Sequence, residues 1–275
     1  MKRIKSSPIF SGLLILALVL GGYFLVKSNR DSNIEVETPI ANMETEESAK
    51  VVNLSLVEER TYKVPDSYAT FDVVYPEFKN AGAEFNQSIS DLAIAGIAQH
   101  KKVSEDSWKA RYETSSEGDG INEFPTEGEK FQFYMSWTPV QVNEEFISVL
   151  VTVGGYTGGA HGYQNLISFN YDVVNKKDVK LSDLFPGNSN YLKTVSDFSR
   201  KDLTTQFRKK LEVKTKDDEK VFQGSVIPMM LAGTTPESLN FSVFTFTKDA
   251  VKLYFTQYQV APYAMGESVV VLSRK

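Results

Sequence analysis

The pattern of apolar and polar positions divides the 275 residues into three parts. Residues 9–26 form an uncharged, strongly apolar run, residues 27–50 are polar, and residues 51–275 mix both kinds of position as folded domains do. As a helix with a rise of about 1.5 Å per residue, the apolar run would cover roughly 27 Å, close to the ~30 Å hydrocarbon core of a membrane. The pattern therefore predicts a membrane segment over 1–26, a linker over 27–50 and a folded region over 51–275.

The apolar run can be interpreted as a signal peptide that is removed or as an anchor that stays. A cleaved signal peptide has a shorter apolar stretch, about 7–15 residues, followed by a small-residue cleavage site. Here the run is longer, and Gly21-Gly22 offers only a poor site, so we favour a signal anchor that spans the lipid bilayer once through residues 9–26. Lys2, Arg3 and Lys5 precede the run, which by the positive-inside rule keeps the N-terminus in the cytoplasm and the folded region outside.

The linker has the composition of a flexible segment. Residues 27–50 contain six acidic and three basic side chains and almost no large apolar ones. Burial of so little apolar surface cannot offset the entropy lost on ordering the chain. As a coil, ~24 residues would reach roughly 25–30 Å, so we expect an acidic tether that holds the folded region away from the membrane.

Segments rich in β-branched and aromatic residues dominate the folded region, and such segments favour strands. They cover residues 51–64, 67–76, 131–142, 146–156, 163–179, 239–247, 251–260 and 267–273. Apolar residues recur at intervals of three and four over 77–103 and 189–211, which predicts two amphipathic helices. The polar stretch 104–129 contains several glycines and is expected to be a long loop.

The order of these elements predicts the fold class. Strands and helices do not alternate regularly, as they would in a doubly wound parallel sheet. We therefore predict an α+β fold with a mainly antiparallel sheet and two amphipathic helices. The order also suggests two related halves, 51–155 and 156–275, although the two helices share too little sequence to establish a repeat.

Composition narrows the function classes. A hydrophobic content of 41% with 24% charged residues is typical of a globular protein, and a net charge of −5 argues against a nucleic-acid-binding surface. The chain has no cysteine, which excludes disulfides, thiolate catalysis, zinc–cysteine sites and a lipid anchor on cysteine. We expect no nucleic-acid partner.

Histidine is scarce, which limits catalysis by metal ions. The chain has only two, His100 and His161, too few for the usual hydrolytic metal sites. His100 lies beside two lysines near the end of the first predicted helix, where we expect it on the surface. We therefore expect no metal, no cofactor and no catalytic residue.

His161 lies in a segment with five glycines in nine residues, 154–162, directly after a predicted strand. Glycine at this density permits left-handed backbone and close approach. A phosphate cradle is excluded because the segment lacks both the P-loop lysine and a following helix. Three interpretations remain: a structural crossover or bulge, which we favour, a ligand contact, or catalysis assisted by Thr157. The residues assigned to the structural role are Gly158, Gly159 and Gly162.

A second signature covers residues 258–266, Tyr-Gln-Val-Ala-Pro-Tyr-Ala-Met-Gly. Pro262 and Gly266 are expected to form the turn between two strands. Tyr258 and Tyr263 are interpreted either as core aromatics with a hydroxyl at the edge, which we favour, or as part of an exposed recognition surface.

These two signatures, with Leu181-Ser182-Asp183-Leu184-Phe185 between them, resemble a bacterial extracytoplasmic family. The family is a domain of unknown function that occurs in RsiV-type anti-sigma factors and in PdaC-type peptidoglycan deacetylases, and the resemblance covers about 51–275. It implies an α+β fold outside the membrane, and in the anti-sigma members this domain binds lysozyme. Neither sigma-factor control nor deacetylation is expected here, because only eight residues precede the apolar run and no separate catalytic domain is present.

The sequence thus predicts a membrane-anchored, non-catalytic binding domain of the bacterial cell envelope. The expected ligand is a lysozyme-like muramidase or peptidoglycan. An envelope hydrolase that uses His161 and a scaffold for another envelope protein remain as alternatives. The residues expected to contact the ligand are Tyr156, Thr157, His161, Tyr258 and Tyr263.

Overall fold

The computed structural model describes residues 51–115, 122–158 and 161–274. The predicted membrane segment, the predicted linker and Gly159 lie outside the described residues. Within these ranges, no helix combines the length and apolar character that a membrane crossing requires.

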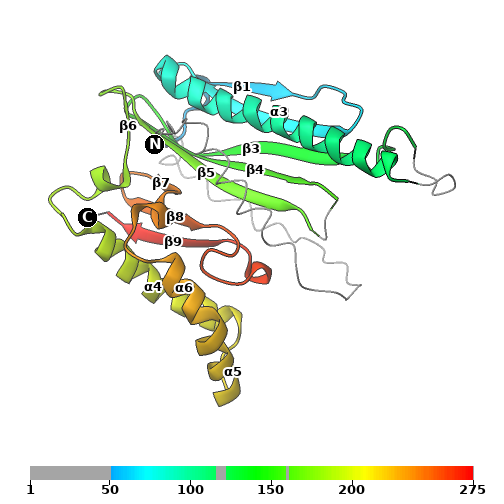
Figure 1. Cartoon of the computed structure of the whole chain (residues 1–275). Helices are drawn as coiled ribbons and strands as arrows, with labels where there is room; N and C mark the ends of the chain where they lie inside the picture. Colours follow the sequence, from blue (N-terminus) through cyan, green and yellow to red (C-terminus); the bar gives the residue numbers. More distant parts are fainter. Residues whose placement is uncertain (1–50, 116–121, 159–160, 275) are drawn as a thin grey trace, which may run out of the picture. The chain divides into compact units, whose positions relative to one another are not determined.

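A six-stranded sheet occupies the first half of the described chain (Figure 1). Its strands are β1 (Val57–Tyr62), β2 (Ala69–Phe78), β3 (Phe131–Val142), β4 (Phe146–Tyr156), β5 (Tyr163–Asp172) and β6 (Lys177–Asp178), in that order. All neighbours are antiparallel except β2 and β3, which are parallel. The predicted mainly antiparallel α+β class is therefore confirmed.

The helix α3 (Ala83–Glu113) connects the parallel strands β2 and β3, a pairing that needs a long crossover. Its buried residues recur every three or four positions and face the sheet: Phe85, Ile89, Ala93, Ile97, His100, Ser104 and Trp108. The helix runs ten residues beyond the predicted end at 103, so the loop predicted from 104 was wrong in its first part. Trp108 continues the stripe, and its Nε1 donates to the carbonyl oxygens of Asn122 and Glu123, both at 3.2 Å.

His100 corrects the sequence-based expectation of a surface histidine. Its side chain is only 4% exposed. Its ring lies among Phe71, Phe131 and Phe133, with centroid distances of 5.9, 6.4 and 5.3 Å. Because α3 extends past this position, His100 belongs to the buried stripe in the middle of the helix rather than to an exposed end.

A three-stranded antiparallel sheet follows later in the chain, in the order β7 (Phe244–Phe246), β8 (Ala250–Phe255) and β9 (Ser268–Ser273). The predicted second helix is α4 (Tyr191–Lys210), whose buried Val195, Leu203 and Phe207 belong to the core of this part. Short 3-10 turns, η2 (Leu181–Leu184), η4 (Ser238–Phe241) and η5 (Tyr263–Met265), connect the elements.

A helical segment between α4 and the small sheet has no counterpart in the sequence-based prediction. It consists of α5 (Lys216–Val221), a π-helical turn η3 (Phe222–Val226) and α6 (Ile227–Gly233). Thr215 begins it as an N-cap, in a capping box with Asp218. The segment does have an apolar helical stripe, because its buried residues recur every four positions: Phe222, Val226 and Met230.

The described chain has two hydrophobic cores. One joins α3 to the six-stranded sheet, from Ala69 to Tyr171, and the other joins α4, α6 and the three-stranded sheet, from Leu181 to Leu272. They divide between Tyr171 and Leu181, later in the chain than the boundary after residue 155 suggested by the sequence.

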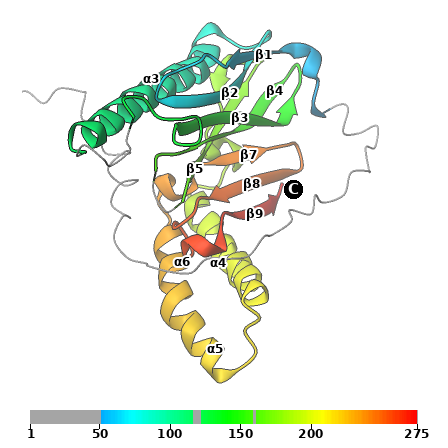
Figure 2. The same ribbon diagram turned by 90° about the vertical axis from the view of Figure 1, so that its right-hand side faces the viewer.

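A polar seam connects the two parts where β7 lies against β4 and β5 (Figure 1 and Figure 2). Asn170 Nδ2 donates to the carbonyl oxygen of Phe244 (2.8 Å), and the Phe246 N–H donates to Ser148 Oγ (2.9 Å). Ser148 Oγ in turn donates to Asn170 Oδ1 (2.6 Å). Side chains of one sheet thus satisfy backbone groups of the other in a buried setting.

Candidate functional site

The glycine-rich end of β4 is shaped by the tyrosine on the neighbouring strand. Gly154 pairs with Tyr134 of β3, and a Cβ placed on Gly154 would lie 2.3 Å from the Tyr134 ring. A Cβ on Gly155 would lie 2.2 Å from the carbonyl oxygen of Gln132. No side chain fits at either position: Gly154 admits the ring of Tyr134 against the strand, and Gly155 admits the close approach of the Gln132 carbonyl.

The glycines singled out in the sequence have separate roles. Gly158 takes a left-handed conformation, with φ of +82°, and Gly266 does the same after η5, with φ of +66°. A Cβ on Gly162 would lie 2.9 Å from the carbonyl oxygen of Gly155, so Gly162 permits close approach of two backbones. Pro262 directly precedes η5 at its N-cap. Gly158 and Gly162 thus allow backbone geometry that a side chain would hinder.

Three of the five predicted contact residues form one aromatic group, which we name the aromatic triad: His161, Tyr258 and Tyr263. The His161 ring stacks on the Tyr263 ring at a centroid distance of 4.2 Å and an interplanar angle of 25°. Tyr258 lies on Tyr263 at 5.4 Å, tilted by 38°. Tyr258 is 56% exposed, so the favoured interpretation of Tyr258 as a core aromatic was wrong. His161 is exposed as well, and the triad presents aromatic surface to solvent.

One backbone carbonyl orients two members of the triad. Tyr263 Oη donates to the Gly162 carbonyl oxygen at 3.3 Å, and His161 Nδ1 lies 2.8 Å from the same oxygen. Because a carbonyl oxygen only accepts, this contact places the proton of His161 on Nδ1. In the neutral ring, Nε2 is then left as an acceptor.

A hydrogen-bond chain lies close to the triad, and we name it the Tyr134 network. Tyr134 Oη donates to Gln164 Oε1 (2.9 Å), and Gln164 Nε2 donates to Glu267 Oε1 (2.7 Å). Burial, the Glu267 carboxylate and Tyr263 together raise the pKa of Tyr134 above its ordinary value. The network therefore joins β3 and β5 to the segment after η5 and holds Tyr134 in its protonated form.

Tyr163, next to this network, is also kept protonated. Burial, and to a lesser degree Tyr134, raises the pKa of Tyr163 to about 12. Neither Tyr134 nor Gln164 nor Glu267 stood out in the sequence, because they are scattered over residues 134–267 and become neighbours only through strand pairing.

The other two predicted contact residues are placed differently. Tyr156 ends β4, pairs with Gln132 in the strand register and is exposed, and Thr157 is exposed directly after it. Within the described residues, neither side chain makes a hydrogen bond or ring contact with the triad. The structure thus brings together His161, Tyr258 and Tyr263 and leaves Tyr156 and Thr157 beside them on the surface.

His161 has few polar contacts around its ring. Among the described residues, its ring nitrogens have one hydrogen-bond contact, the Gly162 carbonyl, and no hydroxyl or carboxylate orients it as a general base requires. The same residues contain no group of three or more histidine, aspartate or glutamate side chains placed to hold a metal ion. What the site offers is an aromatic face with amide and carboxylate groups beside it.

Two protein families and one curated protein are similar to this chain. Residues 63–164 match the family described as "Deacetylase PdaC", and residues 182–275 match "Protein of unknown function (DUF3298)". The chain is 24% identical over 204 residues to the peptidoglycan-N-acetylmuramic acid deacetylase PdaC of Bacillus subtilis strain 168. That alignment covers 74% of this chain but only 37% of the deacetylase.

One solved structure supports the fold. The crystal structure of a DUF3298 family member from Bacteroides fragilis NCTC 9343 superposes with a TM-score of 0.54 at 17% identity, covering 79% of this chain and 90% of that one. A DUF3298 family protein from Pseudomonas aeruginosa PAO1 has a TM-score of 0.41 at 15% identity, over 79% and 88% of the two chains. The predicted family resemblance is confirmed: a match to the PdaC family model is followed along the chain by a match to the DUF3298 family model.

Proposed function

We propose that residues 51–275 form a non-catalytic binding domain of the bacterial cell envelope, with the aromatic triad as its ligand surface and the glycan of peptidoglycan as its ligand. The observation that carries this proposal is the exposed stack of His161, Tyr263 and Tyr258 beside a fixed set of polar groups. The related deacetylase acts, by its name, on a sugar of peptidoglycan, which supports an envelope setting for this chain.

The chemistry of the triad suits a sugar chain. One face of a pyranose ring is largely C–H and packs against an aromatic ring, while its hydroxyl and acetamido groups need hydrogen-bond partners. Tyr258 and His161 supply exposed rings, and Gln164 and Glu267 supply amide and carboxylate groups from the neighbouring network. The Nε2 acceptor of His161 adds a partner for a hydroxyl or amide hydrogen.

Sedimentation with insoluble peptidoglycan tests this proposal on the full chain kept in detergent. Replacing the exposed ring in Tyr258→Ala is expected to weaken binding roughly tenfold, equivalent to ~1.4 kcal/mol. Tyr112→Ala serves as a matched control, because Tyr112 is a comparably exposed tyrosine on α3. Equal binding by the unchanged chain and both variants, or no binding by any, would refute the proposal.

A lysozyme-like muramidase is the second candidate ligand. The net charge of −5 would steer a basic protein toward this domain, an effect on the association rate rather than on affinity. Surface plasmon resonance with a basic muramidase at two salt concentrations separates the candidates. A muramidase that binds specifically gives a saturable response that is lost in Tyr258→Ala. Purely electrostatic attraction gives a response that disappears at high salt and is unchanged by the substitution.

The hydrolase alternative makes an opposite prediction. If His161 were a catalytic base, His161→Ala would abolish release of peptidoglycan fragments by the full chain while leaving its melting temperature nearly unchanged. We expect no release by either protein, as measured by new reducing ends.

The scaffold alternative predicts instead that an envelope protein is recovered with the chain from solubilised membranes, with no loss of that protein in Tyr258→Ala.

We further propose that residues 9–26 anchor the domain in the cytoplasmic membrane, with the folded region outside. The apolar run and the preceding basic residues support this arrangement. Fractionation of cells tests it. The full chain is expected in the membrane fraction and to be degraded by protease added to spheroplasts, whereas protection from that protease would contradict the orientation.

A further inference from the structure

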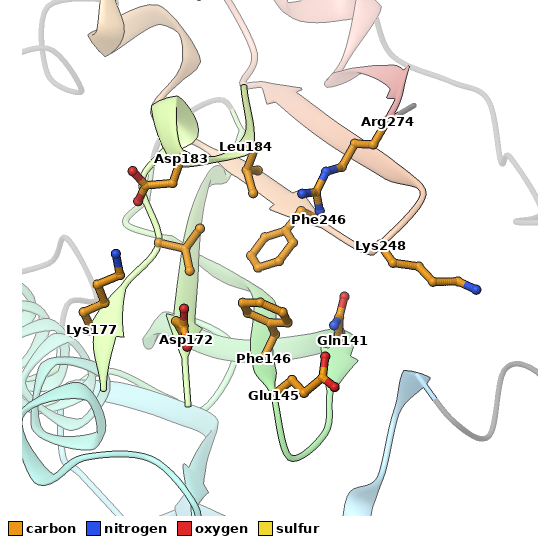
Figure 3. A pocket seen from close by; sticks show the side chains of 11 residues that line it. Gln141, Glu145, Phe146, Asp172, Lys177, Asp183, Leu184, Phe246, Lys248 and Arg274 are labelled. Atoms are coloured by element: carbon orange, nitrogen blue, oxygen red, sulfur yellow. The ribbon is translucent and has the colours of Figure 1, made fainter. Parts of the chain in front are cut away.

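A pocket of about 390 Å³ lies away from the aromatic triad, at the junction of the two sheets (Figure 3). Its lining comes from the turn between β3 and β4, from β5, β6 and η2, and from β7 and the residue after β9. None of its lining residues belongs to the triad or to the Tyr134 network. The pocket is therefore a separate candidate site.

Two aromatic rings form an apolar wall of this pocket. Phe146 of β4 and Phe246 of β7 meet edge to face, with a centroid distance of 5.5 Å and an angle of 77°. Figure 3 shows the two rings facing one another inside the pocket. Each ring comes from a different sheet, so the wall exists only where the two parts of the domain meet.

A cation is held beside this wall. The Arg274 guanidinium lies 5.8 Å from the centroid of the Phe246 ring, and its Nη1 donates to the carbonyl oxygen of Thr247 at 2.8 Å. This bond uses one of the five guanidinium donors and fixes the group in place. A planar, oriented guanidinium suits a carboxylate, which it binds through two parallel hydrogen bonds.

An anion lies on the opposite side of the pocket. Asp172 is buried, and its carboxylate accepts two hydrogen bonds from Asn175, from the backbone N–H and from Nδ2, both at 2.8 Å. Burial opposes the charge of Asp172, but the hydrogen bonds from Asn175 and the charge of Lys177 lower its pKa below the ordinary value. The pocket thus presents fixed charges of both signs.

One buried group in the pocket lacks a partner. Gln141 is 6% exposed, and no described residue donates a hydrogen bond to its Oε1. A register shift of β3 between Pro139 and Gln141 sets the direction of this side chain, and Figure 3 shows it beside Phe146 and Glu145 at the pocket. An unsatisfied buried acceptor costs about 1–3 kcal/mol, so a ligand that donates a hydrogen bond to this oxygen would gain binding energy from it.

We propose that this pocket binds a small zwitterion, a free amino acid or a dipeptide. The ligand carboxylate pairs with Arg274, its ammonium group faces the Asp172 side, an N–H donates to Gln141 Oε1, and its apolar part rests on Phe146 and Phe246. A ligand with both charges can pair with Arg274 and approach Asp172 at once, whereas a ligand of one charge sign interacts favourably with only one of these two groups. The inference does not depend on the proposed function of the triad.

Calorimetric titration of the full chain with alanyl-alanine tests this inference. The probe has both ends free, and the N-acetylated and the C-amidated dipeptide each remove one charge. We expect binding of the free dipeptide and at least tenfold weaker binding of each blocked form. No heat at millimolar dipeptide, or equal binding of free and blocked forms, would overturn the inference.

Gln141→Leu tests the role of the unpartnered amide. We expect at least tenfold weaker binding together with a melting temperature that is equal or higher, because the substitution removes an unsatisfied buried acceptor. Gln87→Leu makes the same chemical change on the exposed surface of α3 and is expected to bind normally. Unchanged binding by folded Gln141→Leu contradicts the inference, and if that variant fails to fold, the comparison of blocked and free dipeptides on the unchanged chain still decides it.

Discussion

At the scale of single residues, His100 is a buried base with no hydrogen-bond partner on Nε2 among the described residues. Burial lowers its pKa from the ordinary 6.5 to about 4, and the Asp66 carboxylate opposes this shift only weakly. The folded protein therefore keeps His100 neutral over a pH range in which the unfolded chain protonates it.

This residue makes folding stability depend on pH. Below about pH 6.5 the unfolded state binds one more proton at His100, so the free energy of unfolding falls until the folded-state pKa near 4 is reached. Between pH 7 and pH 4.5 the loss from this residue is about 2 kcal/mol. Urea unfolding at both pH values measures it, and His100→Leu is expected to lose about 2 kcal/mol less than the unchanged chain.

His161→Ala provides the control for this experiment, since it removes the other histidine from an exposed position. It is expected to show the same acid loss as the unchanged chain. Equal losses in all three proteins would show that His100 is not the source of the acid sensitivity.

Gly154 is a second residue whose effect follows from local geometry. A Cβ there would lie 2.3 Å from the Tyr134 ring and 2.7 Å from the carbonyl oxygen of Tyr163. Overpacking of this kind costs roughly 1–3 kcal/mol, so we expect Gly154→Ala to lower the free energy of unfolding by that amount. Gly128→Ala is the control, because open space surrounds Gly128. Similar stability of the two variants in urea unfolding would contradict the steric argument.

At the scale of elements, β7 depends on side chains of the other sheet. It has three residues, and the side chains of Ser148, Ser168 and Asn170 hydrogen-bond its backbone. Asn170→Ala leaves the Phe244 carbonyl unpaired in a buried setting, which is expected to cost about 1–3 kcal/mol. Asn165→Ala, at an exposed position of β5, the strand that also contains Asn170, is expected to change thermal stability little. Equal melting temperatures of the two variants would contradict the role of the seam.

The elements that the sequence predicts best are those with a clear period. Most strands and both amphipathic helices follow directly from alternation or from the three-and-four spacing. The end of α3 escaped prediction because Ser104 and His100, both polar, occupy buried positions of its stripe. The short β7 and β6 lie inside the predicted strand segments 239–247 and 163–179, and contacts with other strands rather than a local pattern set their bounds.

Some residues of the candidate site could be predicted from the sequence and others could not. His161, Tyr258 and Tyr263 stood out because they lie in unusual local sequences. Gln164, Glu267 and the pocket residue Gln141 lie in ordinary strand segments, and only strand register and the contact of two sheets give them a role. Sequence separation of about a hundred residues, as between Gln164 and Glu267, is beyond any local pattern.

At the scale of the whole described domain, the two family matches follow the two hydrophobic cores. The PdaC-type match, 63–164, covers most of the large-sheet core, and the DUF3298 match, 182–275, covers the other. The aromatic triad takes His161 from the first match and its tyrosines from the second. The proposed ligand surface therefore requires both.

The buried seam predicts that the two cores unfold together. Both tryptophans, Trp108 and Trp137, lie in the large-sheet part, so their fluorescence reports on that part, whereas circular dichroism at 222 nm also detects α4 and α6. We expect the two signals to give one coincident transition in urea. Separate midpoints would show that the parts fold independently, and Asn170→Ala is expected to move the midpoints apart.

The backbone of Tyr258 has a consequence for how this protein evolves. Its φ of +68° lies in the left-handed region, which costs a residue with a side chain about 1–2 kcal/mol that glycine does not pay. A library selected in the laboratory for heat resistance alone is therefore expected to enrich glycine at 258 and so to discard the exposed ring. If selection in living cells instead depletes glycine there, the organism is retaining the ring at a thermodynamic disadvantage.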